Sequence, residues 1–156
     1  TVGWRARWHV SAMAPVGAHL GLVMLNEDVL KPGIADFRPG CDDTTTAAPQ
    51  CQTYGMVSSH AFSSFAALGN GVGVFVFDTI EWSDGNFSGG AFAGEVVFPL
   101  LMAGVSAAGR GIGNYETSGQ IIAGASSGLV VGFLTGMTYS LMQTPECGYS
   151  GSLICW

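Results

Sequence analysis

Four apolar segments follow one another along the chain, at residues 10–25, 61–80, 89–109 and 118–142, and each contains at most one ionisable side chain. A membrane-spanning helix needs roughly 20 mostly apolar residues, so the last three segments are long enough and the first is marginal. None of them shows the polar stripe of an amphipathic surface helix. The pattern predicts an all-α integral membrane bundle of about four transmembrane helices; the alternative is a set of buried helices in a large soluble protein.

Composition favours the membrane interpretation. Only 10% of the residues are charged, the mean hydropathy is +0.39, and 24 of the 156 residues are glycine. A water-facing surface normally carries more charge. The length suits one compact unit, so we expect a single membrane domain over residues 1–156. The first residue is Thr1 and not Met, which indicates a processed form or a fragment.

One inter-helix segment, residues 30–60, is long and polar, and its proline and threonine content predicts a loop of the kind that carries active sites. With four spans, alternation places this loop and the 110–118 connection on one face of the membrane. The N-terminal residues, the 80–88 loop and the C-terminal tail then share the other face. Arg5 and Arg7 mark that second face as cytoplasm-like, so loop 30–60 is expected on the opposite side. An organellar or energy-transducing membrane is one possible location.

The last apolar segment carries a regular row of glycines. Small residues at this spacing lie along one side of a helix and let another backbone approach closely, which is how helices associate in lipid. We expect close helix contact there, within this chain or with a partner subunit. The row consists of Gly124, Gly128, Gly132 and Gly136.

Four cysteines divide between the long loop and the tail. Cys41 and Cys51 lie in the loop and form a plausible disulfide if that face is oxidising. Cys147 and Cys155 lie in the tail, which the predicted topology places across the membrane, so cross-pairing is excluded. Whether the two tail cysteines pair with each other is left open.

Three polar blocks occur in a fixed order along the chain. The sequence resembles the type 2 phosphatidic acid phosphatase and vanadium haloperoxidase superfamily, whose pattern runs K-x6-R-P, then P-S-G-H, then S-R-x5-H-x3-D. Val, Ser and Gly replace the expected Pro, Gly and Ser of the second and third blocks. The matching stretches are Lys31 to Arg38-Pro39, Val57-Ser58-Ser59-His60, and Arg110 followed by Glu116 and Gln120.

The resemblance implies a phosphate-binding site. The family uses the positions matched by Lys31, Arg38 and Arg110 to surround a phosphate with positive charge. Ser58 and His60 would match a phosphate donor and the general acid of the leaving group. Without the family, Ser58 or its neighbour is a sensible helix N-cap and the histidine an ordinary loop residue.

The same resemblance implies lost catalysis. The family nucleophile is a histidine oriented by an aspartate, and Glu116 and Gln120 occupy those two positions. We therefore expect Glu116 to form an ion pair with Arg38 or Arg110 and to fill the phosphate site from within. A bidentate pair with an arginine is the favoured geometry.

Three classes of function follow from these observations. The favoured one is a catalytically inactive, phosphatidic acid phosphatase-like membrane protein that serves as a structural or accessory subunit of a larger membrane complex. The second is a lipid-phosphate or anion-binding protein, and the third is an active lipid phosphatase with an altered nucleophile. We expect membrane lipids and other membrane protein subunits as partners, no nucleic acid, and neither a cofactor nor a metal.

Overall fold

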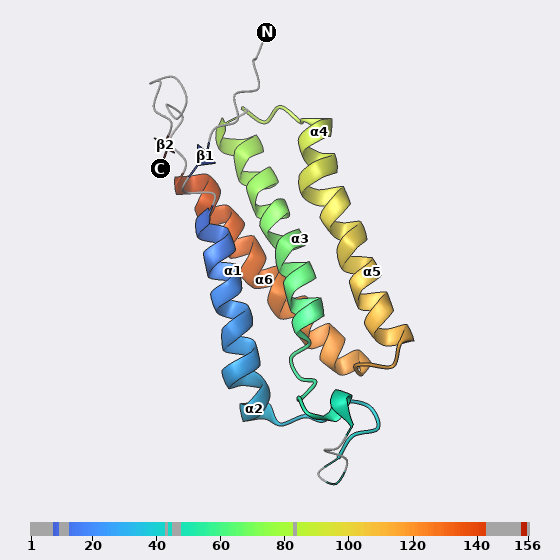
Figure 1. The fold of residues 1–156 in the computed structure, drawn as a ribbon. Helices are drawn as coiled ribbons and strands as arrows, with labels where there is room; N and C mark the ends of the chain where they lie inside the picture. The colour runs from blue at the N-terminus through green and yellow to red at the C-terminus, as the bar shows by residue number, and fades with distance from the viewer. Residues whose placement is uncertain are drawn as a thin grey trace.

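The fold is seen in a computed structural model that describes residues 8–9, 13–42, 44, 48–82, 84–142 and 154–155. Helices dominate these residues, and a two-residue parallel strand pair joins β1 to β2 (Figure 1). The elements in chain order are β1 (Trp8–His9), α1 (Met13–Leu25), η2 (Asn26–Leu30), α2 (Lys31–Ile34), η3 (Pro49–Cys51), α3 (Ser59–Phe77), η4 (Asp78–Trp82), α4 (Gly89–Phe92), η5 (Ala93–Val97), α5 (Phe98–Ile112), α6 (Ser118–Met142) and β2 (Ile154–Cys155). Here η2, η4 and η5 are π-helical turns and η3 is a 3-10 turn.

Three helical stretches of the described chain are long and apolar enough to cross a membrane: Ser59–Ile80, Gly89–Ile112 and Ser118–Leu141. The all-helical membrane architecture is therefore confirmed, whereas the predicted number of four spans is not. The first apolar segment forms α1, which has only 13 residues before the polar run that opens η2. Length and composition do not qualify it as a span on the same criteria.

The helix pair α3 and α6 forms the centre of the fold, and the glycine row of α6 is its contact surface. A Cβ atom on any glycine of the row would lie under 3.0 Å from a backbone carbonyl oxygen of α3 or its N-cap; the row is Gly124, Gly128, Gly132 and Gly136. These carbonyls belong, in the same order, to Ser58, Phe62, Ala66 and Asn70. The predicted close contact thus exists within this chain. Both rows advance by four residues per step, so the two backbones stay in register along the crossing.

The three polar blocks lie at one end of the bundle. In Figure 1, the segment from α2 to α3 and the connection from α5 to α6 are at the bottom. The β1–β2 pair and the connection from α3 to α4 are at the opposite end. This arrangement brings residues far apart in sequence together at the start of α3.

A disulfide joins Cys41 to Cys51 across the segment that precedes α3, with 5.4 Å between the two Cα atoms. The predicted pairing in the loop is confirmed. The backbone amide of Cys41 also donates to the carbonyl of Arg38, 3.0 Å away, so the bridge anchors the stretch that carries this arginine. Of the tail cysteines, Cys147 lies outside the described residues, and only the backbone of Cys155 is described.

Candidate functional site

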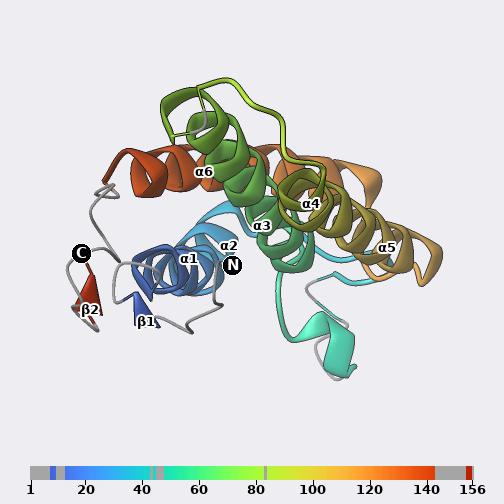
Figure 2. The same ribbon diagram turned by 90° about the horizontal axis from the view of Figure 1, so that it is seen from above.

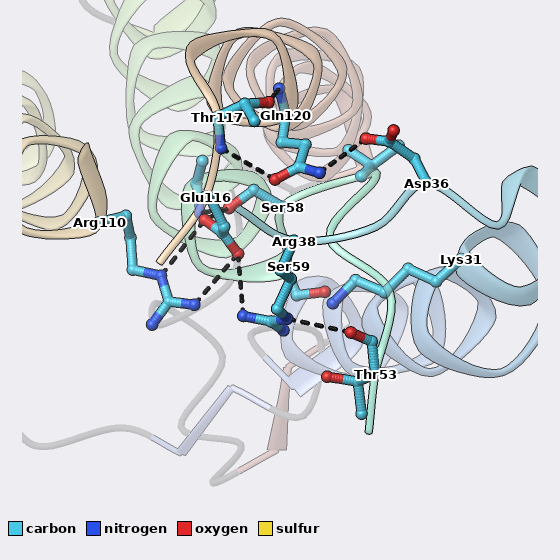
Figure 3. A network of polar contacts seen from close by, with 12 residues as sticks. Lys31, Asp36, Arg38, Thr53, Ser58, Ser59, Arg110, Glu116, Thr117 and Gln120 are labelled. Carbon is cyan, nitrogen blue, oxygen red and sulfur yellow. Dashed lines mark hydrogen bonds and ion pairs between the residues drawn. The ribbon is translucent and has the colours of Figure 1, made fainter. Parts of the chain in front are cut away.

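Glu116 lies at the centre of the polar cluster, in the connection between α5 and α6, and is 3% exposed. Its carboxylate accepts two hydrogen bonds from Arg110, from Nε to Oε2 and from a terminal guanidinium nitrogen to Oε1, both 3.2 Å long. The hydroxyl of Ser58 donates to Oε2 over 2.5 Å. Arg38 forms a longer ion pair with Oε1, at 3.9 Å (Figure 3). The expected bidentate contact with an arginine is present.

Each of these partners is held by its own element. Ser58 is the N-cap of α3, where its hydroxyl oxygen accepts a hydrogen bond of 3.2 Å from the amide of Ala61. Arg110 is in the last turn of α5, and its guanidinium carbon lies 5.0 Å from the centre of the Tyr115 ring. Arg38 donates through Nε to the carbonyl of Thr53, 3.2 Å away. Donors from three parts of the chain therefore converge on one carboxylate.

The surroundings of Glu116 favour its ionised form. Burial alone would raise the pKa of this carboxyl group, but the hydrogen bonds from Arg110 and Ser58 and the positive charges of Arg110 and Arg38 outweigh it. The pKa of Glu116 is held below its ordinary value of 4.5. At neutral pH the site therefore contains a carboxylate that already occupies the donors of Arg110 and Ser58.

Gln120 takes a structural role at the start of α6. The amide of Thr117 donates to Gln120 Oε1 over 2.9 Å, and Thr117 Oγ1 accepts from the amide of Gln120 over 3.2 Å. This reciprocal pair is a capping box. Gln120 Nε2 also donates to Asp36 Oδ2 at 2.6 Å and to the carbonyl of Phe37 at 2.8 Å. The fully buried side chain thus fastens the segment that precedes Arg38 to α6.

Lys31 is placed differently from the prediction. It is the first residue of α2 and not a loop residue, because the helix that begins at Met13 continues through η2 into α2. Its ammonium group pairs with Glu27 at 2.7 Å, four residues earlier on the same helix, and the residue is 3% exposed. Ser59 donates to the same Glu27 carboxylate. Lys31 is therefore neutralised locally and makes no ion pair with Glu116 among the described contacts.

His60 lies in the first turn of α3 and is exposed. Among the described residues, no hydrogen bond or ion pair connects its imidazole with Glu116 or with the arginines that bind it. Its neighbour Ser59 is buried and points the other way, toward Glu27. The structure thus assembles Ser58, Arg38, Arg110 and Glu116 closely, with His60 at the rim.

The sequence patterns assign no role to three residues that donate or accept hydrogen bonds in this region: Asn26, Glu27 and Asp36. Asn26 is 1% exposed and donates through Nδ2 to Ser59 Oγ at 2.7 Å and to the carbonyl of Val57 at 3.0 Å. Glu27 and Asp36 supply the two further carboxylates. The spacing of Glu27 and Lys31, four residues apart, is a recognisable helical ion-pair signal. The long-range bonds of Asn26 and Asp36 have no comparable signal in a single sequence.

The charges of the cluster cancel. Lys31, Arg38 and Arg110 contribute three positive charges. Three carboxylates lie in the same region. Glu27 pairs with Lys31, Glu116 pairs with the two arginines, and Asp36 accepts a hydrogen bond from Gln120. In the described part of the chain there is no group of three or more His, Cys, Asp or Glu side chains that could hold a metal ion. The arrangement provides two ion-pair groups at one end of the helical bundle: Lys31 with Glu27, and Arg38 and Arg110 with Glu116.

Comparison with protein-family models, with curated proteins and with solved structures gives no match for this chain.

Proposed function

We propose that this protein is a catalytically inactive relative of the type 2 phosphatidic acid phosphatase and vanadium haloperoxidase superfamily, and that it serves as a structural subunit of a larger membrane complex. The observation that carries this proposal is the occupancy of the candidate phosphate position. The carboxylate of Glu116 takes the hydrogen bonds of Arg110 and Ser58 and the ion pair of Arg38. A substrate phosphate would have to displace a buried anion from the same donors.

The groups around Glu116 also lack a working nucleophile. Covalent phosphoryl transfer needs an activated nucleophile with a partner that orients it. Gln120, at the position of the orienting residue, is fully committed to the capping box and to Asp36. Ser58 uses its hydroxyl to cap α3 and to bind Glu116. These commitments favour a structural role for residues that the family uses in catalysis.

The runner-up, an anion-binding protein, is less well supported because each of the three cations already has a carboxylate partner within the chain. An anion site needs donors that are free in the unliganded protein. Here Lys31 is paired with Glu27, and Arg110 is paired with Glu116 through two hydrogen bonds. The same three cations that suggest anion binding in the sequence are therefore already compensated by this chain's own carboxylates.

The span Gly89–Ile112, which is lightly packed within the chain, supports a role in assembly. Only 6% of the Gly89–Ile112 window is buried within the chain, against 33% for Ser59–Ile80. Its exposed side chains are apolar, with Leu101 at 62% and Val105 at 69% exposure. A Cβ atom on Gly104 would meet nothing within 4 Å. Such a face suits contact with lipid and with the helix of a neighbouring subunit.

Our proposal includes a fourth crossing and a defined orientation. The helix that starts at Met13 runs on through η2 and α2 to Ile34, long enough to cross a bilayer despite its polar last turns. The disulfide between Cys41 and Cys51 then supports an oxidising environment for the end of the bundle that carries Glu116. Loop residues 30–60 would face the side opposite the cytoplasm.

The experiment is to isolate the tagged full-length chain from its native membrane in mild detergent and to measure the size of the particle that carries it. We expect a particle much larger than the 16.1 kDa chain, with other membrane proteins in fixed proportion. Gly104→Phe, on the open face of the Gly89–Ile112 span, should release the chain from that particle. Asp84→Asn, at an exposed loop position, should not. A wild-type chain that migrates alone would contradict the proposal.

A further inference from the structure

A groove of about 300 Å³ opens between α1, α3 and α6, away from the Glu116 cluster. Helix α1 contacts both α3 and α6, and α3 crosses α6 (Figure 2). Most of the lining is apolar, with Leu20 from α1, Ala67 from α3 and Val131 from α6. Three polar side chains, His19, Asn70 and Thr135, interrupt it.

The groove lies at the middle of the membrane-spanning helices. Asn70 is close to the centre of the Ser59–Ile80 span, and Thr135 lies well inside the Ser118–Leu141 span. Water does not supply hydrogen bonds at this depth, so an unpaired polar group there is costly. Polar side chains within spans commonly mark functional sites for this reason.

His19 is the polar group without a partner. Its ring stacks on Phe62 with the ring centres 6.2 Å apart, and the described residues offer its two nitrogens no hydrogen bond. Asn70 is only partly satisfied, because its Nδ2 donates to Thr135 Oγ1 over 3.3 Å and its oxygen has no partner in the described chain. His19 on α1 and Asn70 on α3 therefore both offer unused hydrogen-bonding atoms to the groove.

We propose that this groove binds an uncharged lipid-soluble molecule whose hydroxyl or carbonyl oxygen hydrogen-bonds with His19 and Asn70. Among the side chains that the structure describes, none that lines the groove is charged, which argues against a phosphate or carboxylate headgroup as the recognised chemistry. The remaining lining is apolar and suits a hydrocarbon chain or ring. A hydroxyl fits best, since it can donate to one of the two residues and accept from the other.

The size of the groove favours a small molecule over a partner helix. A volume of 300 Å³ is at the lower end of the range for ligand pockets, and a helix with its side chains is about 10 Å wide. The polar side chains of His19, Asn70 and Thr135 all line this one groove, where an extended molecule can reach them.

The test uses two photoreactive probes of equal length in native membranes: a long-chain alcohol with a diazirine group and the matching hydrocarbon without the hydroxyl. We expect the wild-type protein to be labelled at the groove about threefold to tenfold more by the alcohol, the factor that one hydrogen bond provides. His19→Phe keeps the ring and its stacking but removes both nitrogens, and should bring the alcohol down to the level of the hydrocarbon.

A second variant keeps the test decisive if His19→Phe folds poorly. Ala67→Phe fills the groove and leaves His19 in place, so labelling by both probes should fall together. Leu100→Phe, in a separate apolar groove between α3, α5 and α6, is the matched control and should leave labelling unchanged. Equal labelling by the two probes, or labelling that survives Ala67→Phe, would overturn the proposal. Cross-linking of a photoreactive residue at position 67 to a neighbouring protein would also overturn it.

Discussion

Glu116 and Arg110 form a bidentate pair: two guanidinium nitrogens each lie 3.2 Å from a different oxygen of the same carboxylate. This is the geometry in which arginine binds carboxylates and phosphates most strongly. The pair joins the end of α5 to the start of α6, and Ser58 links it to α3. A position where the resembling family performs chemistry thus connects three helices in this protein.

The first prediction concerns the charge of Glu116. Glu116→Gln keeps the shape of the side chain but leaves Arg110 and Arg38 without their counter-ion. Breaking a buried ion pair from one side typically costs about 3–5 kcal/mol, and the partial exposure of the arginines places this case near the lower end. Thermal unfolding in detergent should show the loss, with Asp84→Asn as an exposed control. Equal stability of Glu116→Gln and the wild type would mean that the pair contributes nothing to the fold.

A second prediction concerns pH. The pKa of Glu116 is lower in the folded protein than its ordinary value of 4.5, so the folded state binds the proton less readily than the unfolded chain. The corresponding stabilisation is complete above pH 4.5 and is lost as the pH falls through the lower folded pKa. Unfolding temperatures measured from neutral pH down to strongly acidic pH should therefore decline more steeply for the wild type than for Glu116→Gln. Parallel curves would contradict the assigned cause.

A third prediction follows from the occupied donors. Glu116→Ala removes the carboxylate and leaves Arg38, Arg110 and Ser58 around the space that it filled. Inorganic phosphate or vanadate should then stabilise the variant against thermal unfolding, by about 2.7 kcal/mol at 100 times the dissociation constant. The wild type should not respond. If the anion stabilises both proteins equally, or neither, the carboxylate does not stand in the place of an oxyanion.

How much of this site the sequence could predict depends on the range of each interaction. The resemblance, which matches Lys31, Arg38 and Arg110 to phosphate-binding positions and Glu116 to the nucleophile position, implies a bidentate pair, and the structure contains one. The sequence did not reveal that Lys31 would be compensated by Glu27, because Lys31 was expected in a loop. The apolar pattern ends at residue 25, whereas the helix continues through η2 and α2 to Ile34 and so includes the first residues of the predicted loop.

Helix positions were predictable to different degrees for a physical reason. The last span was placed at 118–142 and forms α6 over the same residues, because its apolar run is long and free of charge. The apolar run predicts the first span at 10–25, but the structure continues the helix to Ile34 through polar residues, of which Asn26 donates to Ser59 and Glu27 accepts from it. Such long-range contacts leave no local pattern in the sequence.

A fourth prediction tests the contact of α3 with α6. Gly128→Leu places a side chain where a Cβ alone would lie under 3.0 Å from the backbone of Phe62. Overpacking of this kind costs about 1–3 kcal/mol, and more where backbone must move. Gly109→Leu, on α5, is the matched control, since a Cβ there meets nothing within 4 Å. Unfolding of the purified chain should separate the two variants clearly, and equal effects would show that the glycine row is not a packing surface.

The most direct test of the account is hydrolysis of phosphatidate and of a generic aryl phosphate by the purified wild-type protein, in parallel with Arg110→Ala. Because Glu116 takes the position that the resemblance gives to the nucleophile, and already binds Arg110 and Ser58, we expect no turnover above the rate without protein. Turnover that survives purification and disappears in Arg110→Ala would show that the site is an active phosphatase, and would contradict the account at its centre.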